Sequence, residues 1–109
     1  MGALKIIIYA TKIGNEPYSI WENTLDTKTK AVVINRLDRI KLGNFGDAKR
    51  IKNGNGVWEL RVDFGPGYRI YFGKKDTTLI ILLIGGQKKS QNRDITKAKQ
   101  YWADYKDLT

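Results

Sequence analysis

The chain has 109 residues; 41% are hydrophobic, twenty are Lys or Arg, and eleven are Asp or Glu, which gives a formal net charge of +9. This length predicts one domain, residues 1–109, with a single core, and the charge favours a polyanionic partner, nucleic acid first and an acidic protein or a membrane surface second. The absence of cysteine and histidine excludes disulfides and thiolate chemistry and removes the commonest acid–base catalyst and metal ligand, so we expect no metal and no cofactor.

Two short elements open the chain. Leu4 to Ala10 is an apolar run with three consecutive isoleucines, which is typical of a buried strand. Pro17 suits the first turn of a short helix that ends near Asn23. The apolar side of this helix is formed by Tyr18, Ile20, Trp21 and Leu25.

A clearer helix follows. Asp26 or Thr27 can cap its start, it runs to about Leu42, and Gly43 is a stop signal. Its basic face is either an ordinary solvated surface or a surface for nucleic acid or a partner. The apolar face holds Val33, Leu37 and Ile40, and the basic face holds Lys28, Lys30, Arg36, Arg39 and Lys41.

Most of the excess positive charge lies between residues 28 and 52. This stretch has eight Lys and Arg against two acids, Asp38 and Asp47, a net charge of +6. Within it, Ala48 to Lys52 is predicted to form a short strand, and Asn53 to Gly56 a tight return.

Residues 56–72 predict a β-hairpin around the turn Gly65-Pro66-Gly67. Apolar and polar residues alternate on both sides of the turn, which is typical of half-buried strands. Apolar residues can pair only with partners of equal parity, because a slip of one residue moves a whole face into water. A three-residue loop closed by Phe64 and Tyr68 meets this condition, and it sets Val62 opposite Ile70, Leu60 opposite Phe72, Asp63 opposite Arg69 and Arg61 opposite Tyr71.

The last part of the chain predicts a strand, a loop and a helix. Thr77 to Ile84 is apolar at both parities, so it should be a central strand covered on both faces and ended by Gly85-Gly86. A basic loop, Gln87 to Arg93, leads to a helix from Asp94 to about Tyr105. No apolar run reaches the roughly 18 residues of a membrane span, and no secretory signal pattern opens the chain; we expect a cytoplasmic protein with no membrane partner.

This order of elements predicts an α+β domain. We expect a twisted antiparallel sheet of about four to five strands, with two N-terminal helices and one C-terminal helix packed on one face.

The residue types available suit phosphate chemistry. There is no phosphate-binding Gly-rich loop, no Cys/His metal pattern and no serine–histidine triad. Guanidinium groups, however, bind phosphate oxygens in pairs and stabilise a charged transition state. The candidate site gathers Arg61, Arg69 and Tyr71 on the exposed hairpin face, with Lys88 and Lys89 after the last strand.

Two interpretations of this surface remain open. If the substrate is RNA, Arg61 and Arg69 can balance the charge of the phosphorane, Tyr71 can stack on a base, and Glu59 or a lysine of lowered pKa can act as the general base. Alternatively, the charges of the sheet face only pair with one another, Asp63 with Arg69 and Glu59 with a nearby lysine.

Six motifs follow one another at normal spacing: Arg36-Leu37-Asp38-Arg39, Gly43 to Lys49, Gly56 to Arg61, Gly65 to Phe72, Leu82 to Gln91, and Asp94 to Ala98. Together they resemble the addiction-module killer proteins, the HigB-like, phage Gp49-like branch of the RelE/ParE toxin superfamily. The resemblance covers roughly Leu4 to Trp102. It implies a RelE-like fold and a small basic toxin of a type II toxin–antitoxin system, held in check by a cognate antitoxin that is commonly a helix-turn-helix protein.

The resemblance also implies an activity. Toxins of the RelE and HigB branches enter the ribosomal A site and cleave mRNA, so the ribosome and mRNA are expected partners and the expected enzyme is a metal-free endoribonuclease. The alternatives are a non-catalytic ParE-like toxin that acts on DNA gyrase by protein contact, and a degenerate toxin kept for regulation. Candidate RNA-binding residues are Arg36, Arg39, Lys49, Arg50, Lys52 and Arg93.

Individual residues match the superfamily pattern unevenly. Arg69 corresponds to a functional arginine of RelE-type toxins, and Lys88 or Lys89 to the basic residue after the last strand. Val57 and Glu59 stand where RelE-type enzymes have lysines, their C-terminal tyrosine falls near Ile95, and the histidine that HigB-type enzymes often use is missing.

Overall fold

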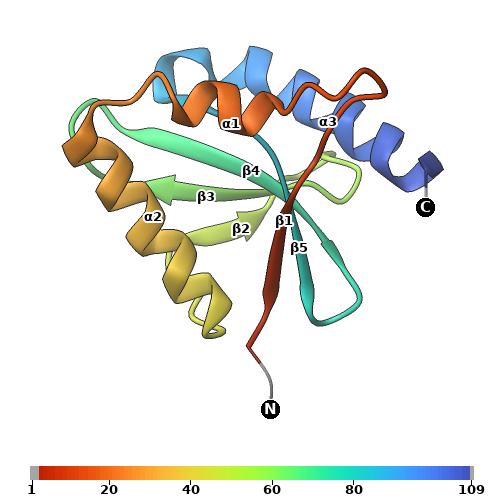
Figure 1. The fold of residues 1–109 in the computed structure, drawn as a ribbon, viewed down its shortest axis with the longest axis horizontal. Coiled ribbons are helices and arrows are strands. Elements are labelled where there is room, and N and C mark those ends of the chain that lie inside the picture. Colours follow the sequence, from red (N-terminus) through yellow and green to blue (C-terminus); the bar gives the residue numbers. More distant parts are fainter. Residues whose placement is uncertain (1–2, 109) are drawn as a thin grey trace.

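The computed structural model describes residues 3–108 and shows an α+β fold built on a five-stranded sheet (Figure 1). The strands lie in the order β1-β5-β4-β3-β2. The elements are β1 (Lys5–Ile8), α1 (Pro17–Glu22), α2 (Thr27–Lys41), β2 (Ala48–Arg50), β3 (Trp58–Val62), β4 (Tyr68–Lys75), β5 (Leu79–Gln87), a single 3-10 turn η1 (Lys88–Ser90) and α3 (Gln91–Leu108).

The sheet is mixed, so the prediction of an antiparallel sheet is wrong for one strand. β1 pairs with β5 in parallel, with Ile7 opposite Ile81, whereas the other neighbouring strands are antiparallel. The predicted central position of β5 is confirmed, because β1 and β4 flank it. Two helices and three strands separate β1 from β5 in the chain. A connection of this length can bring β5 beside β1 in the same direction, which a short hairpin turn cannot do.

The predicted start and end of the long helix are confirmed. Asp26 is the N-cap of α2, and its Oδ1 accepts a hydrogen bond of 2.7 Å from the backbone N–H of Thr29. This bond to the charged carboxylate holds the pKa of Asp26 below its usual value. At the other end Gly43 has φ +88°, a conformation that stops the helix cheaply because glycine has no Cβ.

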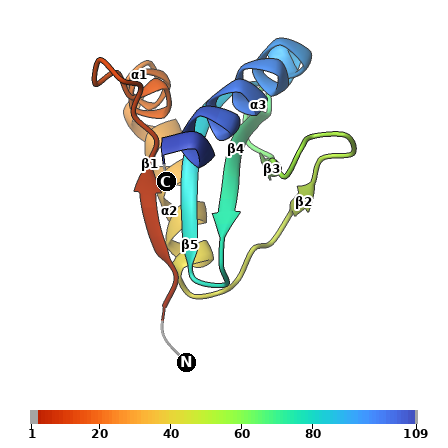
Figure 2. The same cartoon turned by 90° about the vertical axis from the view of Figure 1, so that its right-hand side faces the viewer.

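Helices cover both faces of the sheet, so the prediction that they pack on one face is wrong. Figure 2 shows α1 and α2 on one side of the sheet and α3 on the other. One apolar cluster joins α1 and α2 to one face of the sheet, and a second joins α3 to Tyr71, Ile81, Leu83 and Ile84. The strand residues of the first cluster include Leu60, Val62, Tyr68, Ile70, Phe72, Ile80 and Leu82. The physical reason lies in β5, which is apolar at both parities and therefore needs cover on both sides.

The hairpin has the predicted faces but a different register. Leu60 lies opposite Ile70 and Arg61 opposite Arg69, a shift of two residues from the predicted pairs. The last strand pair is Val62 with Tyr68, so the loop is five residues long, 63–67, instead of three. Parity could not distinguish these registers, because a shift of two keeps every side chain on its face.

Two glycines predicted to end the last strand are inside it. β5 continues through Gly85 and Gly86 to Gln87. A Cβ at Gly85 would lie 2.3 Å from Cε3 of Trp21, and one at Gly86 would lie 1.9 Å from Oδ2 of Asp94. These positions are therefore glycine because a helix residue approaches the strand from each face. The predicted basic loop, Gln87 to Arg93, is wrong: Gln87 ends β5, Lys88–Ser90 form η1, and α3 begins at Gln91.

Candidate anion-binding site

Glu59 lies at the centre of the candidate site and is buried beneath the start of α3, with 1% of its surface exposed. Its carboxylate accepts a hydrogen bond of 2.7 Å from Nε2 of Gln91 and one of 3.4 Å from Nε of Arg61. Nε of Arg69 lies 3.8 Å from the same carboxylate. The predicted exposed polar face is thus covered at Glu59, where α3 brings Gln91 against it, whereas Arg61 stays partly exposed.

The two candidate arginines are cross-strand neighbours that share this carboxylate. Arg61 is the more accessible, with 38% of its side chain exposed, whereas Arg69 has 10%. Nη1 of Arg69 donates a hydrogen bond of 3.1 Å to the backbone carbonyl of Tyr68. Asp63 is exposed and pairs with neither arginine in the described chain, so the predicted Asp63–Arg69 pair is wrong. Two guanidinium groups therefore surround one carboxylate and leave a local excess of positive charge.

Tyr71 is fully buried, so the prediction of an exposed base-stacking ring is wrong. It is 0% exposed, and its hydroxyl has no hydrogen-bond partner among the described residues. Burial raises the pKa of Tyr71 above its usual value, and the negative charges of Glu59 and Asp94 raise it further, whereas Arg69 lowers it. The ring forms part of the apolar cluster under α3 and cannot reach a nucleotide without movement of that helix.

A hydrogen-bonded pair at the start of α3 was not singled out from the sequence. Oγ of Ser90 donates a hydrogen bond of 2.5 Å to Oδ2 of Asp94, and Asp94 is buried against Gly86. The sequence holds one sign of this pair, Gly86, where a side chain would clash with Asp94. The prediction that Gly85-Gly86 ends the strand gave this glycine another explanation. This pair anchors the first turn of α3 over the sheet.

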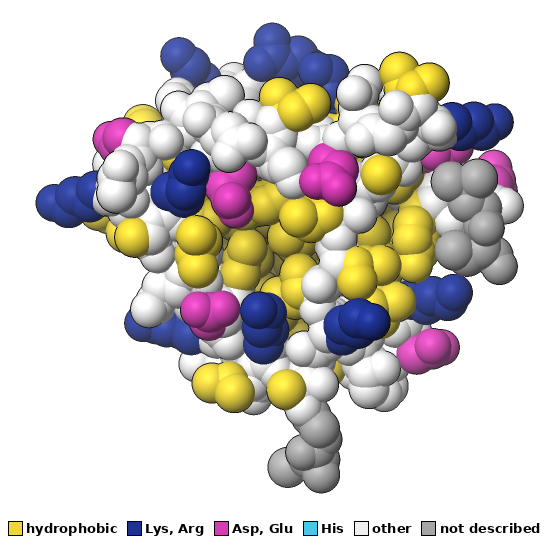
Figure 3. Space-filling view, in the orientation of Figure 1, with side chains coloured by type: hydrophobic (Ala, Val, Ile, Leu, Met, Phe, Trp, Pro, Cys, Tyr) yellow, Lys and Arg dark blue, Asp and Glu magenta, His cyan; other side chains and the backbone are white. Residues whose placement is uncertain are grey.

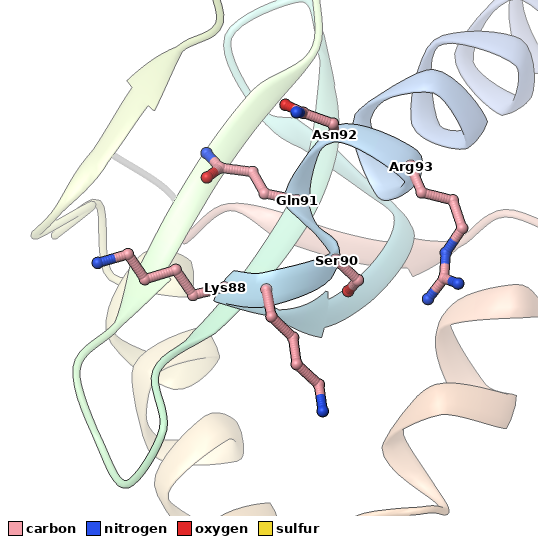
Figure 4. A pocket seen from close by; sticks show the side chains of 6 residues that line it. Lys88, Ser90, Gln91, Asn92 and Arg93 are labelled. Carbon is pink, nitrogen blue, oxygen red and sulfur yellow. The ribbon is translucent and has the colours of Figure 1, made fainter.

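A surface hollow of about 550 Å³ opens at η1 and the first turn of α3. Figure 4 shows Lys88 and Gln91 extending to one side of this turn and Arg93 to the other. The backbone N–H of Lys88 donates a hydrogen bond of 3.1 Å to the carbonyl of Gly67, in the loop that precedes Arg69. The structure thus brings Lys88 next to the hairpin loop that ends two residues before Arg69. The hollow is lined by Lys88, Lys89, Ser90, Gln91, Asn92 and Arg93.

The predicted RNA-binding residues separate into groups. Lys49 lies opposite Glu59 in the β2–β3 pair, on the same sheet face as the two arginines of the site, and is exposed. Arg36 and Arg39 lie on α2, beyond the other face of the sheet, where they line a different hollow of about 450 Å³. Arg50 and Lys52 are exposed on and after the edge strand β2.

An apolar hollow lies on the opposite side of the molecule from the arginines. Figure 3 shows hydrophobic side chains gathered in a depression with charged residues around its rim. This face holds a hollow of about 210 Å³ between β1, α1 and α2, where Ile8 is 38% exposed and Ile34 is 42% exposed.

No helix in residues 3–108 is long and apolar enough to cross a bilayer.

Comparison with known proteins places this architecture in a family. Residues 21–103 match the family model described as phage-derived protein Gp49-like (DUF891). The chain belongs to this family. A Haemophilus influenzae protein named "Uncharacterized protein" is 41% identical to it over 83 residues, which cover 75% of this chain and 82% of that protein.

The match confirms the resemblance drawn from the six motifs. The Gp49-like family is the family of addiction-module killer proteins. Membership indicates a toxin of a toxin–antitoxin pair and implies an antitoxin as its partner.

Proposed function

We propose that this Gp49-like toxin inhibits translation by ribosome-dependent cleavage of mRNA, without a metal ion. The observation that carries the proposal is the cross-strand pair of Arg61 and Arg69, which surround a single carboxylate next to the basic hollow at the start of α3. A guanidinium pair with net positive charge fits a phosphodiester group, since each guanidinium matches two phosphate oxygens.

The arginines are assigned to binding and charge stabilisation. When the 2′-hydroxyl attacks the phosphorus, its proton passes to solvent water, and the bond from phosphorus to the 5′-oxygen then breaks. Negative charge accumulates on the phosphorane oxygens between these two events, and preorganised cations at that position lower the barrier. Arg61 has the more exposed side chain, and Arg69 is the less exposed residue opposite it on β4. Lys88, Lys89 and Arg93 add positive charge around the hollow.

Glu59 is not assigned as the general base. Its carboxylate is 1% exposed and already accepts hydrogen bonds from Gln91 and Arg61. A protonated lysine is a natural proton donor, and Lys88 is bonded through its backbone to the turn that precedes Arg69. We therefore assign Lys88 to protonation of the 5′-oxygen that leaves.

RNA flanking the cleaved bond is assigned to the same side of the molecule. Lys49 lies in register with Glu59 at the edge of the sheet, and Arg93 is on the far side of the hollow. Arg36 and Arg39 lie on α2, away from this path, and suit a separate contact with ribosomal RNA or an acidic antitoxin surface.

The test compares substitutions at Arg69 with one at a remote exposed lysine. We expect Arg69→Ala to lower mRNA cleavage by about 100- to 1000-fold, the usual cost of losing one transition-state donor, and to abolish growth arrest. Arg69→Lys keeps the charge but loses the paired donors, and we expect it to remain strongly impaired. Lys12→Ala, in the exposed loop before α1, is the control and should retain full activity.

Cleavage is measured by mapping the ends of transcripts after induction, together with growth and the supercoiling of a reporter plasmid. Folding of each variant is checked by circular dichroism. Growth arrest with intact transcripts and lost supercoiling would instead support a gyrase-directed toxin. The absence of growth arrest for the wild-type chain would indicate a degenerate toxin.

A further inference from the structure

We infer that Gln91 is a positioning residue that keeps Glu59 from drawing Arg69 inward, and that it thereby holds both guanidinium groups ready for a phosphate. The inference rests on the proposed function for its substrate, but its geometry concerns only four side chains. They come from three elements: Glu59 and Arg61 from β3, Arg69 from β4, and Gln91 from the first position of α3.

The contacts of the carboxylate show a competition for one oxygen. Oε2 of Glu59 accepts a hydrogen bond from Nε of Arg61. Oε1 accepts the shorter bond of 2.7 Å from Nε2 of Gln91, and Nε of Arg69 stays 3.8 Å from this same oxygen. A separation of 3.8 Å is beyond hydrogen-bond range, so Oε1 is bonded to Gln91 and pairs with Arg69 by charge alone. We take the bond from Gln91 to hold the carboxylate at this distance from Arg69.

The state of Arg69 supports this interpretation. Its Nε is buried and has no hydrogen-bond partner in the described part of the chain, which is costly for a charged donor. The missing bond of Arg69 Nε is not due to the lack of an acceptor nearby, because the carboxylate of Glu59 lies 3.8 Å away. The nearest acceptor for this Nε is Oε1 of Glu59, which already accepts the hydrogen bond from Gln91.

The terminal guanidinium nitrogens of the two arginines are the groups that can bind a phosphate. Glu59 contacts both arginines at Nε, the nitrogen nearest the backbone. Among the described residues no hydrogen bond or ion pair holds the terminal nitrogens of Arg61, and those of Arg69 have one bond, from Nη1 to the carbonyl of Tyr68. A closer Glu59–Arg69 pair would rotate the guanidinium of Arg69 and neutralise more of its charge, which weakens its attraction for phosphate.

This role makes an unusual prediction, because stability and ligand binding should change in opposite directions. In Gln91→Ala, and in Gln91→Met, which keeps the volume of the side chain, Arg69 can bond Oε1 directly. We expect the melting temperature to stay the same or rise, while the affinity for phosphate falls about tenfold, the effect of one charge-assisted hydrogen bond. A residue that only supports the fold would lower both.

The probe is inorganic phosphate, titrated into the full-length protein at low salt. Binding is followed by NMR through the Nε–H signals of Arg61 and Arg69. Gln100→Ala is the matched control, because Gln100 is exposed on the same helix and has no part in the site; its affinity for phosphate should equal that of the wild type.

A second arm tests the mechanism. In a Glu59→Gln background there is no carboxylate to draw Arg69 inward, so Gln91→Ala should have little further effect on phosphate affinity. A full tenfold loss in that background would overturn the inference. It would also be overturned if Gln91→Ala bound phosphate as the wild type does, or if phosphate moved neither arginine signal in the wild-type protein.

The outcome is separable from that of the proposed function. Phosphate binding that depends on Gln91 in a protein that leaves transcripts intact would contradict mRNA cleavage and support the positioning role. Cleavage that is unchanged in Gln91→Ala and Gln91→Met would support the proposed function and overturn the positioning role.

Discussion

The two faces of the sheet bury neighbouring residues of the same strand in opposite ways. Leu60 is 0% exposed and packs into the apolar cluster under α1 and α2, whereas Glu59 is 1% exposed and lies among donors under α3. Two equally buried neighbours of one strand thus have different surroundings, apolar side chains for Leu60 and hydrogen-bond donors for Glu59. The first face has a mainly apolar cluster, with polar contacts such as the bond from the Tyr18 hydroxyl to Glu22. The second combines an apolar cluster around Ala98 and Trp102 with a charged group at the start of the helix.

A polar residue of an alternating strand can lie in the interior where several elements converge, as Glu59 does. Glu59 receives its partners from β3, β4 and α3, and the partner in α3 is 32 residues away in sequence. Buried charges are tolerated only when they are paired and hydrogen-bonded. We therefore expect substitutions among the donors around Glu59 to change phosphate binding, and substitutions in the apolar cluster of either face to change stability.

The largest expected effect is on the apolar face. Leu60→Ala removes a fully buried side chain and should lower the free energy of unfolding by about 2–5 kcal/mol. Urea unfolding measures this change. Phosphate titration of the folded fraction should be unchanged, because Leu60 points away from the arginines; weakened phosphate binding would show that the two faces are not independent.

A smaller effect is expected where α3 docks on the second face. A Cβ at Gly73 would lie 2.3 Å from Cζ3 of Trp102. Gly73→Ala should therefore push the indole ring outward and cost about 1–3 kcal/mol, measured by urea unfolding with tryptophan fluorescence. The cost should shrink in a Trp102→Leu background, which removes the clash; an equal cost there would assign the effect to the backbone of β4.

The smallest effect at neutral pH is expected at Tyr71. Its buried hydroxyl has no hydrogen-bond partner among the described residues, so Tyr71→Phe should change stability by only about 0–1 kcal/mol at pH 7, in the stabilising direction.

Alkaline pH should enlarge the effect of this variant. The pKa of Tyr71 is raised in the folded state, first by burial and then by Glu59 and Asp94. An unfolded tyrosine loses its proton near pH 10, whereas the folded protein retains it, so the stability of the wild type should fall as pH rises above about 10. Tyr71→Phe should fall less steeply in urea unfolding between pH 8 and 11. Part of the decline should remain, because burial and bonds to Asp104 and Glu22 also raise the pKa values of Tyr9 and Tyr18. An identical slope in both proteins would contradict the assignment.

Local patterns were the reliable part of the sequence. The cap at Asp26 and the central position of the strand after Thr78 are confirmed, as is the family drawn from the motifs. Alternation placed Arg61 and Arg69 on one face correctly. It left the hairpin register open by two residues, because a loop of three and a loop of five satisfy the same parity.

Alternation along the strands is enough to tell which side chains share a face, since the periods of helices and strands are properties of the local backbone. The packing of α3 against the sheet could not be predicted in this way; it buries Tyr71 and brings Gln91 to Glu59. Alternation within two strands contains no information about the side chains that a third element, here α3, places against them. A carboxylate that looks solvent-facing from its own strand becomes a buried centre when donors from β4 and α3 reach it.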